Sequence, residues 1–294
     1  MQNNVPTVGI IGGGFVGGAH ANVFKHYTDV KIYDIDENKR THDYADVISQ
    51  DVLFVCVPTP MQESGLVDIS ILDQALGELE NAQGESETPV IIKSTVPPEK
   101  LDELYANFGH LGCLIYSPEF LTERTAELDL QNSTRFIFGL CRAGRVAGNL
   151  DRTIVDNLFN ARFPRVPIHW VTYRQASLVK YFTNAFFASK ISLLNEFYDI
   201  AEAIGEDGQD TIDLMLLDQR IGRSHHMVPG HDGKRGFGGT CFPKDINGLI
   251  QSALHYGITP TILDAAWEVN LRLRPEKDWE KDVGRAISKK EEKE

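Results

Sequence analysis

The sequence predicts an α/β fold in which an N-terminal Rossmann-type domain with a parallel sheet precedes a helical domain with one long central helix. Short apolar runs of strand length alternate with helix-length polar segments from Val8 to Gly139. A glycine-rich turn follows the first of these runs. Residues 176–204 contain no proline or glycine and carry apolar residues at helical spacing. We therefore expect a Rossmann domain at residues 1–170, a helical domain at 171–275 and a charged tail at 276–294.

Composition limits the classes of function. The 294 residues, 42% of them hydrophobic, suffice for a large core and favour two domains. A formal net charge of −13 disfavours nucleic acid as a partner. The N-terminus lacks the pattern of a signal peptide, and no apolar run reaches the ~18 residues of a membrane span. We expect a cytoplasmic protein with no membrane partner.

The cysteines favour a reduced environment and no metal. None of the four forms a C-x-x-C pair, and the adjacent His225 and His226 lack zinc-ligand spacing. We predict that Cys56, Cys113 and Cys141 are buried core residues, since a thiol that is neither catalytic nor ligating behaves as a small hydrophobic group. The sequence therefore predicts no metal site.

The first strand leads into a dinucleotide-binding pattern. Gly12, Gly14 and Gly17 match G-x-G-x-x-G, in which the glycines permit a tight turn, close approach of the pyrophosphate and close packing of the helix. Asp34 ends the next strand, 22 residues after Gly12, where an acid that binds ribose hydroxyls is expected. A carboxylate there favours NAD because it repels a 2′-phosphate, although Lys39–Arg40 leave NADP open. The alternative is a turn without a ligand.

Three further stretches carry polar chemistry. Lys180 and Asn184 share one face of the long helix, although each also has an ordinary interpretation as a solvated or packed helix residue. Lys93–Pro97 and Ser117–Leu121 each follow a strand, where sites form in parallel sheets. Cys241 follows a glycine-rich stretch at the predicted N-terminus of a helix, a position that favours the nucleophilic thiolate form.

These motifs together resemble the UDP-glucose/GDP-mannose dehydrogenase family. The resemblance rests on GGGFVG, VPTP, KSTVPP, SPEFLTE, KYFTNAFFASKISLLNE, DQRIG and GFGGTCFPKD, and it extends over nearly the whole chain. It implies an NAD-dependent four-electron oxidation of the C6 alcohol of a nucleotide sugar, with UDP-glucose as the first choice, of the kind that serves polysaccharide biosynthesis. Cys241 would form first a thiohemiacetal and then a thioester, which water hydrolyses.

The resemblance also assigns roles to individual residues. It implies the catalytic residues Cys241, Lys180, Asn184, Asp245, Glu119 and Thr95. It implies cofactor contacts from Gly12, Gly14, Phe15, Val16, Gly17, Asp34, Pro58, Thr59, Thr95 and Lys244. It implies substrate contacts from Phe120, Leu121, Glu123, Lys180, Asn184, Arg220, Phe237, Gly238 and Gly239. Glu119 and Thr95 have a simpler alternative as caps of a helix and of a strand end.

The chain departs from the family pattern in two places. The segment between Asp34 and Val52 is short, so the sheet is expected to lack a strand or to have a trimmed edge. Family members continue into a second Rossmann-like domain, whereas this sequence stops about 50 residues after the cysteine motif, with charged residues that favour a natural end. We therefore expect the loop between Arg220 and Cys241 to supply phosphate contacts, with Lys234 and Arg235 as the main donors.

Two other functions remain open at this stage. A two-electron hydroxyacid dehydrogenase would use the same lysine and asparagine on the long helix, would not need Cys241, and would stop after one NADH. The second alternative is a non-catalytic or partner-dependent NAD-binding protein, which would bind NAD without turning over a substrate on its own. The long helix is typical of a homodimer core, and its apolar residues on more than one face favour a partner helix. Four of these residues are predicted to belong to the core of the chain: Phe186, Phe187, Leu193 and Leu194.

Overall fold

The computed structural model describes residues 5–84, 86–111, 113–140 and 149–289 and divides into two compact units. Unit 1 comprises Met1–Thr59 and Ile69–Lys180, and unit 2 comprises Pro60–Asp68 and Tyr181–Glu294. The expected boundary at residue 170 lies ten residues too early. Tyr173 and Ala176 of the long helix are buried against the sheet of unit 1, so the first turns of that helix belong to the Rossmann domain.

Unit 1 alternates strands and helices. Its strands are β1 (Val8–Ile11), β2 (Val30–Tyr33), β3 (Val52–Val55), β4 (Pro89–Ile92), β5 (Cys113–Tyr116), β6 (Phe136–Leu140) and β7 (Ile168–Thr172). Its helices are α1 (Phe15–Phe24), α2 (Tyr44–Ile48), α3 (Ser70–Gln83), α4 (Pro98–Phe108), the 3₁₀ turn η1 (Glu123–Thr125), α5 (Ala126–Gln131) and α6 (Asn149–Arg162). The long helix α7 (Tyr173–Ala203) begins in unit 1 and continues into unit 2.

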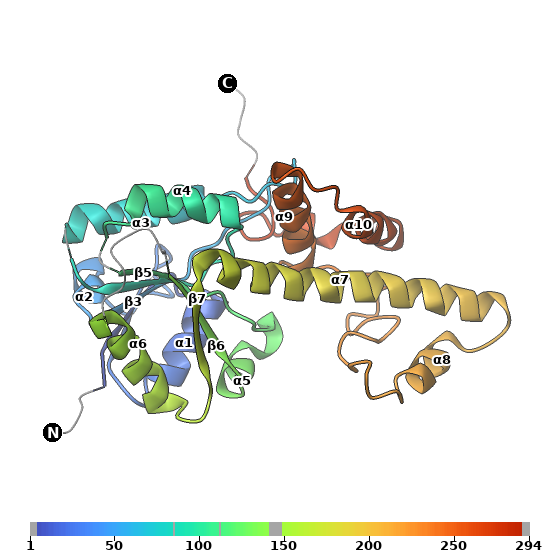
Figure 1. Cartoon of the computed structure of the whole chain (residues 1–294), viewed down its shortest axis with the longest axis horizontal. Coiled ribbons are helices and arrows are strands. Elements are labelled where there is room, and N and C mark those ends of the chain that lie inside the picture. The colour runs from blue at the N-terminus through green and yellow to red at the C-terminus, as the bar shows by residue number, and fades with distance from the viewer. Residues whose placement is uncertain (1–4, 85, 112, 141–148, 290–294) are drawn as a thin grey trace. The chain divides into compact units, whose positions relative to one another are not determined.

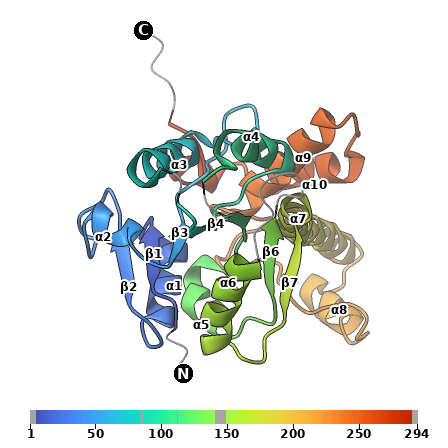
Figure 2. The same cartoon turned by 60° about the vertical axis from the view of Figure 1, so that its left-hand side comes forward.

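The strands form one sheet in the order β2-β1-β3-β4-β5-β6-β7 (Figure 2). Strands β1 to β5 are parallel as predicted, but β6 pairs antiparallel with β5, and β7 is parallel to β6. The six-residue α5 is the longest helix between β5 and β6, so this connection is not the helical crossover that joins parallel neighbours. Strand β2 pairs with β1 alone among the described residues and forms one edge of the sheet.

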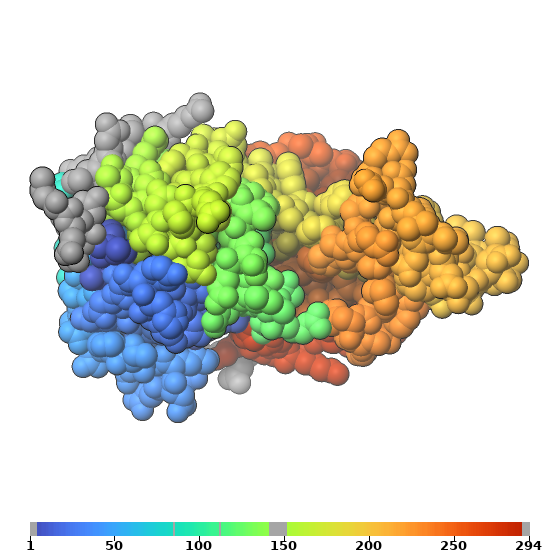
Figure 3. Space-filling view, turned by 90° about the horizontal axis from the view of Figure 1, so that it is seen from below, coloured from blue at the N-terminus to red at the C-terminus, as the bar shows by residue number. Residues whose placement is uncertain are grey.

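Apolar side chains cover both faces of the sheet. One core packs α1, α5 and α6 against the sheet, and the other packs α2, α3 and α4 against the opposite face, as Figure 1 shows. In the space-filling view of the first face, the blue surface of α1 adjoins the green surface of α5 (Figure 3). Strands buried on both sides explain why the sequence shows continuous apolar runs instead of alternation.

Unit 2 is helical. It contains the rest of α7, α8 (Gly208–Met215), α9 (Phe242–His255), α10 (Thr261–Leu273) and the 3₁₀ turn η2 (Asp278–Lys281). Ile246, Ile250 and Ala266 form one small core with Ala188 of α7. In the described ranges, no helix has the length and apolar character needed to cross a membrane.

The segment after α10 is not the solvated tail that the charge pattern predicts. Trp279 and Ala286 are each 2% exposed and share a core with Met61. The backbone of Met61 also accepts a hydrogen bond from the amide of Ser288 at 2.8 Å. A single tryptophan among charged residues anchors this segment, which sequence composition alone does not reveal.

The outer face of α7 in unit 2 differs from the predicted core. Leu194 is buried, whereas Phe186 is 65% and Leu193 is 48% exposed. Both belong to a stripe of apolar side chains that are 40% to 74% exposed: Phe182, Phe186, Leu193, Phe197, Ile200 and Ile204. Their spacing of three, four or seven residues places them along one side of the helix.

Candidate active site

The glycine-rich turn has no room for a side chain at Gly12 or Gly17. Gly12 has a φ of +99°, and a Cβ there would lie 2.7 Å from the carbonyl oxygen of Cys56. A Cβ on Gly17 would lie 2.0 Å from the carbonyl oxygen of Gly12. Gly14, in contrast, faces open space and begins α1 without a side-chain cap. The N-terminus of α1 therefore has the shape and the partial positive charge that suit a pyrophosphate.

Asp34 is held against this turn. Its Oδ2 accepts a hydrogen bond from the amide of Gly13 at 2.6 Å, and its Oδ1 accepts one from the amide of Asp36 at 2.8 Å. The carboxylate is thus fixed beside the turn, where ribose hydroxyls would donate to it. Lys39, which left NADP open, forms an ion pair with Asp36 at 3.2 Å. The residues present fit the adenosine diphosphate half of NAD.

The strand ends beside this turn are tied together. The hydroxyl of Thr59 donates to the carbonyl oxygen of Thr95 at 2.7 Å, and that of Ser94 donates to the carbonyl oxygen of Val57 at 2.6 Å. Thr59 is buried and Pro58 is exposed. These bonds hold the VPTP and KSTVPP segments, which follow β3 and β4, side by side at the carboxyl edge of the sheet.

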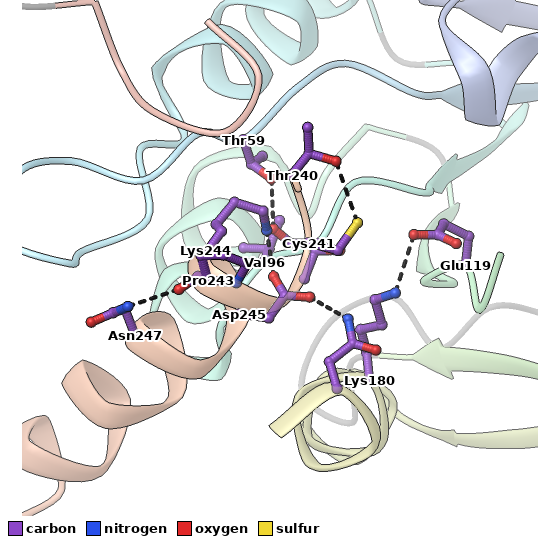
Figure 4. Close-up of polar contacts among 12 residues, drawn as sticks. Thr59, Val96, Glu119, Lys180, Thr240, Cys241, Pro243, Lys244, Asp245 and Asn247 are labelled. Carbon is purple, nitrogen blue, oxygen red and sulfur yellow. Dashed lines mark hydrogen bonds and ion pairs between the residues drawn. The ribbon is translucent and has the colours of Figure 1, made fainter. Parts of the chain in front are cut away.

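Glu119 and Lys180 form a buried ion pair within unit 1 (Figure 4). The Nζ of Lys180 lies 3.1 Å from Oε1 of Glu119, and both side chains are almost fully buried. The second oxygen of Glu119 accepts a hydrogen bond from the amide of Leu121. The interpretation of Lys180 as a solvated helix residue is therefore wrong, and the local cap expected of Glu119 coexists with the ion pair.

A second buried lysine lies beside this pair, at the start of a stretch that the sequence marks as polar without an individual role for the lysine. Lys93 is 4% exposed and donates to the hydroxyl of Ser117 at 3.2 Å. Burial lowers the pKa of Lys93 to about 8, and the nearby carboxylate of Glu119 opposes this shift. The lysine lines a cavity of about 310 Å³ together with His20 and the segment that contains Glu119. The signal was present, because Lys93 begins KSTVPP directly after β4.

Burial also controls His20. Its Nδ1 lies 2.9 Å from the carbonyl oxygen of Val16, and its Nε2 is buried without a hydrogen-bond partner. Because that carbonyl accepts, Nδ1 carries the proton, and Nε2 has a free lone pair. Burial, with a smaller contribution from the charge of Lys93, lowers the pKa of His20 to about 3. His20 is therefore neutral at ordinary pH.

Cys241 occupies the N-cap position of α9 in unit 2. Its Sγ lies 3.6 Å from the hydroxyl oxygen of Thr240, and its carbonyl oxygen accepts the amide of Asp245 at 2.8 Å. The thiol is half-buried, so it is reachable from solvent, as a nucleophile must be. Cys113 is buried as predicted and Cys56 is half-buried, while Cys141 lies outside the described residues.

Asp245 joins two neighbours beneath the cysteine (Figure 4). Its side chain is 1% exposed, and its two oxygens accept hydrogen bonds from Asn184 Nδ2 and Lys244 Nζ, each at 2.5 Å. A buried carboxylate requires such partners. Asn184, Lys244 and Asp245, which the resemblance assigned to the site, are thus brought together in unit 2.

The residues implied in substrate binding have different surroundings. Arg220 is exposed and forms an ion pair with Asp218 at 2.5 Å, and Glu123 is also exposed. Phe120 and Leu121 are partly buried. Phe237, in contrast, is 3% exposed and belongs to the core of unit 2, so its side chain is a packing residue.

Lys234 and Arg235, the expected phosphate donors of the loop, have acidic partners in the described structure. Arg235 donates to the side chain and carbonyl oxygen of Asn195 and pairs with Asp199 at 2.7 Å, so its guanidinium is occupied by α7. Lys234 pairs with Glu276 at 2.7 Å on the surface. Both bases have partners within unit 2. Across the described ranges, no group of three or more histidine, cysteine or acidic side chains is arranged to hold a metal ion.

A Rossmann sheet with an intact dinucleotide turn, followed by a helical unit with a cysteine at a helix N-terminus, is typical of dehydrogenases that use a nicotinamide dinucleotide. Residues 39–147 match the model of the UDP-glucose/GDP-mannose dehydrogenase family, NAD binding domain. Residues 174–272 match the model of the same family, central domain. The chain belongs to the UDP-glucose/GDP-mannose dehydrogenase family, and NAD is its cofactor.

Individual relatives agree with this assignment. The chain is 31% identical over 255 residues to UDP-glucose 6-dehydrogenase AglM of Haloferax volcanii, covering 82% of this chain and 57% of that protein. It is 34% identical over 245 residues to UDP-glucose 6-dehydrogenase of Rickettsia typhi, covering 82% and 54%. A solved UDP-glucose dehydrogenase from Pyrobaculum islandicum superposes with a TM-score of 0.80 at 26% identity, over 92% of this chain and 69% of that one. The chain thus spans about half the length of the curated relatives that it matches.

Proposed function

We propose that the chain catalyses the four-electron oxidation of the C6 alcohol of a nucleotide sugar to a carboxylate. One observation carries this proposal: Cys241 sits at the N-terminus of α9, one turn before the buried Asp245 that holds Asn184 and Lys244. An alcohol dehydrogenase that stops at the carbonyl has no use for a nucleophilic cysteine. A cysteine can instead capture an aldehyde and carry it to the acid level.

The first half of the reaction removes a hydride and a proton from the alcohol. Bound NAD⁺ supplies the hydride acceptor in both oxidation steps. Lys180 and Asn184 lie one turn apart on α7 and offer hydrogen-bond donors to the oxygen at the reacting carbon. The buried carboxylate of Glu119 keeps Lys180 in place.

In the second half, the thiolate of Cys241 adds to the aldehyde carbon, and the carbonyl oxygen becomes the oxygen of a thiohemiacetal. Loss of a second hydride from that carbon gives a thioester. Water then attacks the thioester carbon, the C–S bond breaks, and the thiol is regenerated with the carboxylic acid. Asp245 positions or activates this water, with Glu119 and Thr95 in supporting roles. The overall balance is one alcohol, two NAD⁺ and one water to one carboxylate, two NADH and three protons.

UDP-glucose is the proposed substrate. Both of these relatives are named UDP-glucose 6-dehydrogenase, which supports the choice of nucleotide and sugar. Phe120, Leu121, Glu123, Arg220, Gly238 and Gly239 remain the proposed substrate contacts. A thiolate nucleophile requires a reducing environment, so we place the reaction in the cytoplasm.

We also propose that two copies of the chain pair through the exposed stripe on α7. Phe186 and Ile200 lie on it, and Leu214 and Leu217, at the end of α8, are likewise more than 60% exposed. Exposed apolar side chains gathered along one side of a helix are typical of an interface with another protein. Sedimentation is expected to give twice the 32.9 kDa of one chain. Phe186→Asp is expected to give a monomer, whereas Glu78→Lys, an exposed position on α3 of unit 1, is expected to keep the dimer. A monomeric parent chain would refute the proposal.

The activity is tested by counting NADH. The purified chain is incubated with NAD⁺ and, separately, with UDP- and GDP-hexoses, and we expect two NADH per UDP-glucose. Cys241→Ala is expected to abolish this yield, whereas Cys113→Ala, which removes a buried thiol elsewhere, leaves two NADH per sugar.

The alternatives give different results in the same assay. One NADH per substrate from a 3-hydroxyacid, unaffected by Cys241→Ala, would establish a two-electron hydroxyacid dehydrogenase. Tight NAD binding without turnover of any sugar would establish a non-catalytic or partner-dependent protein. Either result overturns the four-electron proposal for this chain.

A further inference from the structure

The loop that leads to Cys241 is held by side chains from α10 and beyond. Asn270, which is fully buried, brackets the peptide of Phe237 from both sides. Its Oδ1 accepts the amide of Phe237 at 2.7 Å, and its Nδ2 donates to the carbonyl oxygen of Phe237 at 2.9 Å. The backbone is therefore fixed four residues before the cysteine.

Arg274 binds the same loop one helical turn further on. Its guanidinium is 2% exposed and donates to the carbonyl oxygen of Arg235 at 3.1 Å. It also pairs with Asp232 at 2.7 Å and with Asp278 at 3.1 Å. A buried guanidinium is costly unless its donors are satisfied. Arg274 therefore holds the loop in the conformation that supplies these acceptors.

Asp278 connects this arginine to the residues next to the cysteine. Its Oδ1 accepts from Arg274, and its Oδ2 accepts the amide of Gly239 at 3.1 Å. Gly238 allows this approach, because a Cβ there would lie 2.3 Å from Nη1 of Arg274 and 2.4 Å from the carboxylate of Asp278. The space beside Gly238 is therefore filled by Arg274 and Asp278 of the same unit.

We propose that Asn270, Arg274 and Asp278 form a clamp that positions the nucleophile, with Asp278 as the residue that transmits its effect to Cys241. This inference rests on the proposed role of Cys241. With Phe237 and Gly239 fixed, Thr240 and Cys241 enter α9 in one conformation, and the sulfur stays at the helix N-terminus where the thiolate is favoured. The three clamp residues are positioning residues, since none of them needs to touch the substrate.

The test is the rate of alkylation of Cys241 by iodoacetamide from pH 6 to pH 9, with Cys241→Ser as the blank for the other thiols. Asp278→Ala is expected to slow alkylation at pH 7 about fivefold and to move the midpoint of the pH profile upwards, because the sulfur leaves the helix terminus. Asp278→Asn keeps an acceptor for Gly239 and is expected to recover most of the rate. Glu280→Ala, in the same 3₁₀ turn but 56% exposed, is the matched control and should match the parent chain.

Gly238→Ala is a second variant that displaces the loop from an intact clamp. It is expected to reproduce the effect of Asp278→Ala, and it serves in its place if that variant fails to fold. An unchanged pH profile in the folded variants, even with a lower melting temperature, would overturn the clamp. A shifted profile in a chain that never oxidises a sugar would leave the clamp standing and refute the proposed function. Oxidation of a sugar by the parent chain, together with an unshifted pH profile of alkylation in the variants, would support the proposed function and refute the clamp.

Discussion

The side-chain amide of Asn184 donates a 2.5 Å hydrogen bond to Oδ2 of Asp245, which joins α7 to the first turn of α9. The other oxygen of Asp245 accepts from Lys244, so the carboxylate has a donor on each side. The simple interpretation of Asn184 as a polar residue satisfied by a neighbouring helix therefore holds together with its place in the site. Any reaction step that needs Asn184 must use its remaining hydrogen or release Asp245.

We predict strong coupling between these two residues. Asn184→Ala should lower the free energy of unfolding by about 1–3 kcal/mol, because it leaves one oxygen of Asp245 without its donor. Asp245→Ala should lower it by about 3–5 kcal/mol, because it leaves both Asn184 and the buried Lys244 without an acceptor. The double variant should lose at least about 1 kcal/mol less than the sum of the two single losses. Urea unfolding of the four proteins measures this difference. Asn184→Ala combined with Glu196→Ala, an exposed site on the same helix, should be additive.

The buried pair of Glu119 and Lys180 should behave differently from a surface pair. Glu119→Gln or Lys180→Met leaves one charge buried alone and is expected to cost about 3–5 kcal/mol in the free energy of unfolding. The two changes together should cost less than the sum of the two single losses, because neither charge of the pair then remains buried without the other. A loss in the double variant that equals the sum of the two single losses would contradict the buried arrangement.

Arg174 and Asp102 provide the control for that measurement. They form an ion pair at 2.8 Å within unit 1, but the side chain of Arg174 is 59% exposed. Removing the Arg174 side chain should change the free energy of unfolding by only about 0–1 kcal/mol. Asp102 is left unchanged, because it also accepts a hydrogen bond from the hydroxyl of Tyr173. The contrast tests burial, since both pairs join α7 to the sheet domain.

Asp34 is expected to determine cofactor affinity and selectivity. Asp34→Asn keeps an acceptor for Gly13 but loses the charge that binds ribose hydroxyls and repels a 2′-phosphate. NAD affinity should fall about tenfold, and the preference for NAD over NADP should narrow. Isothermal titration with both dinucleotides measures this. As a control, Asp29→Asn, at an exposed position just before β2, should leave the affinity for both dinucleotides as in the parent chain.

Much of this arrangement follows from local sequence, and the rest depends on long-range contacts. The glycine turn and Asp34 are specified within one β-α-β segment, so their spacing predicted their geometry. The direction of β6 was not predictable, because an apolar run does not encode the sense in which a strand pairs. The clamp was missed for a related reason: Asp278 reaches Gly239 across 39 residues, through an arginine whose burial is visible only in the fold.

His20 should make the stability of the fold dependent on pH. Burial lowers its pKa from 6.5 to about 3, so between these values the unfolded chain binds a proton that the folded chain excludes. Stability from this group is therefore complete above about pH 6.5 and is lost as the pH falls towards 3. Protonation of His20 in the unfolded chain should lower the free energy of unfolding by about 2 kcal/mol when the pH falls from 7 to 5.

His20→Gln should flatten this dependence, because glutamine can still donate to Val16 but does not titrate. Urea unfolding at pH 5 and pH 7 measures the difference for each protein. His26→Gln, at an exposed position just after α1, should keep the pH dependence of the parent chain. If His20→Gln and the parent chain lose the same free energy between pH 7 and pH 5, His20 is protonated in the folded chain, and burial does not hold it neutral.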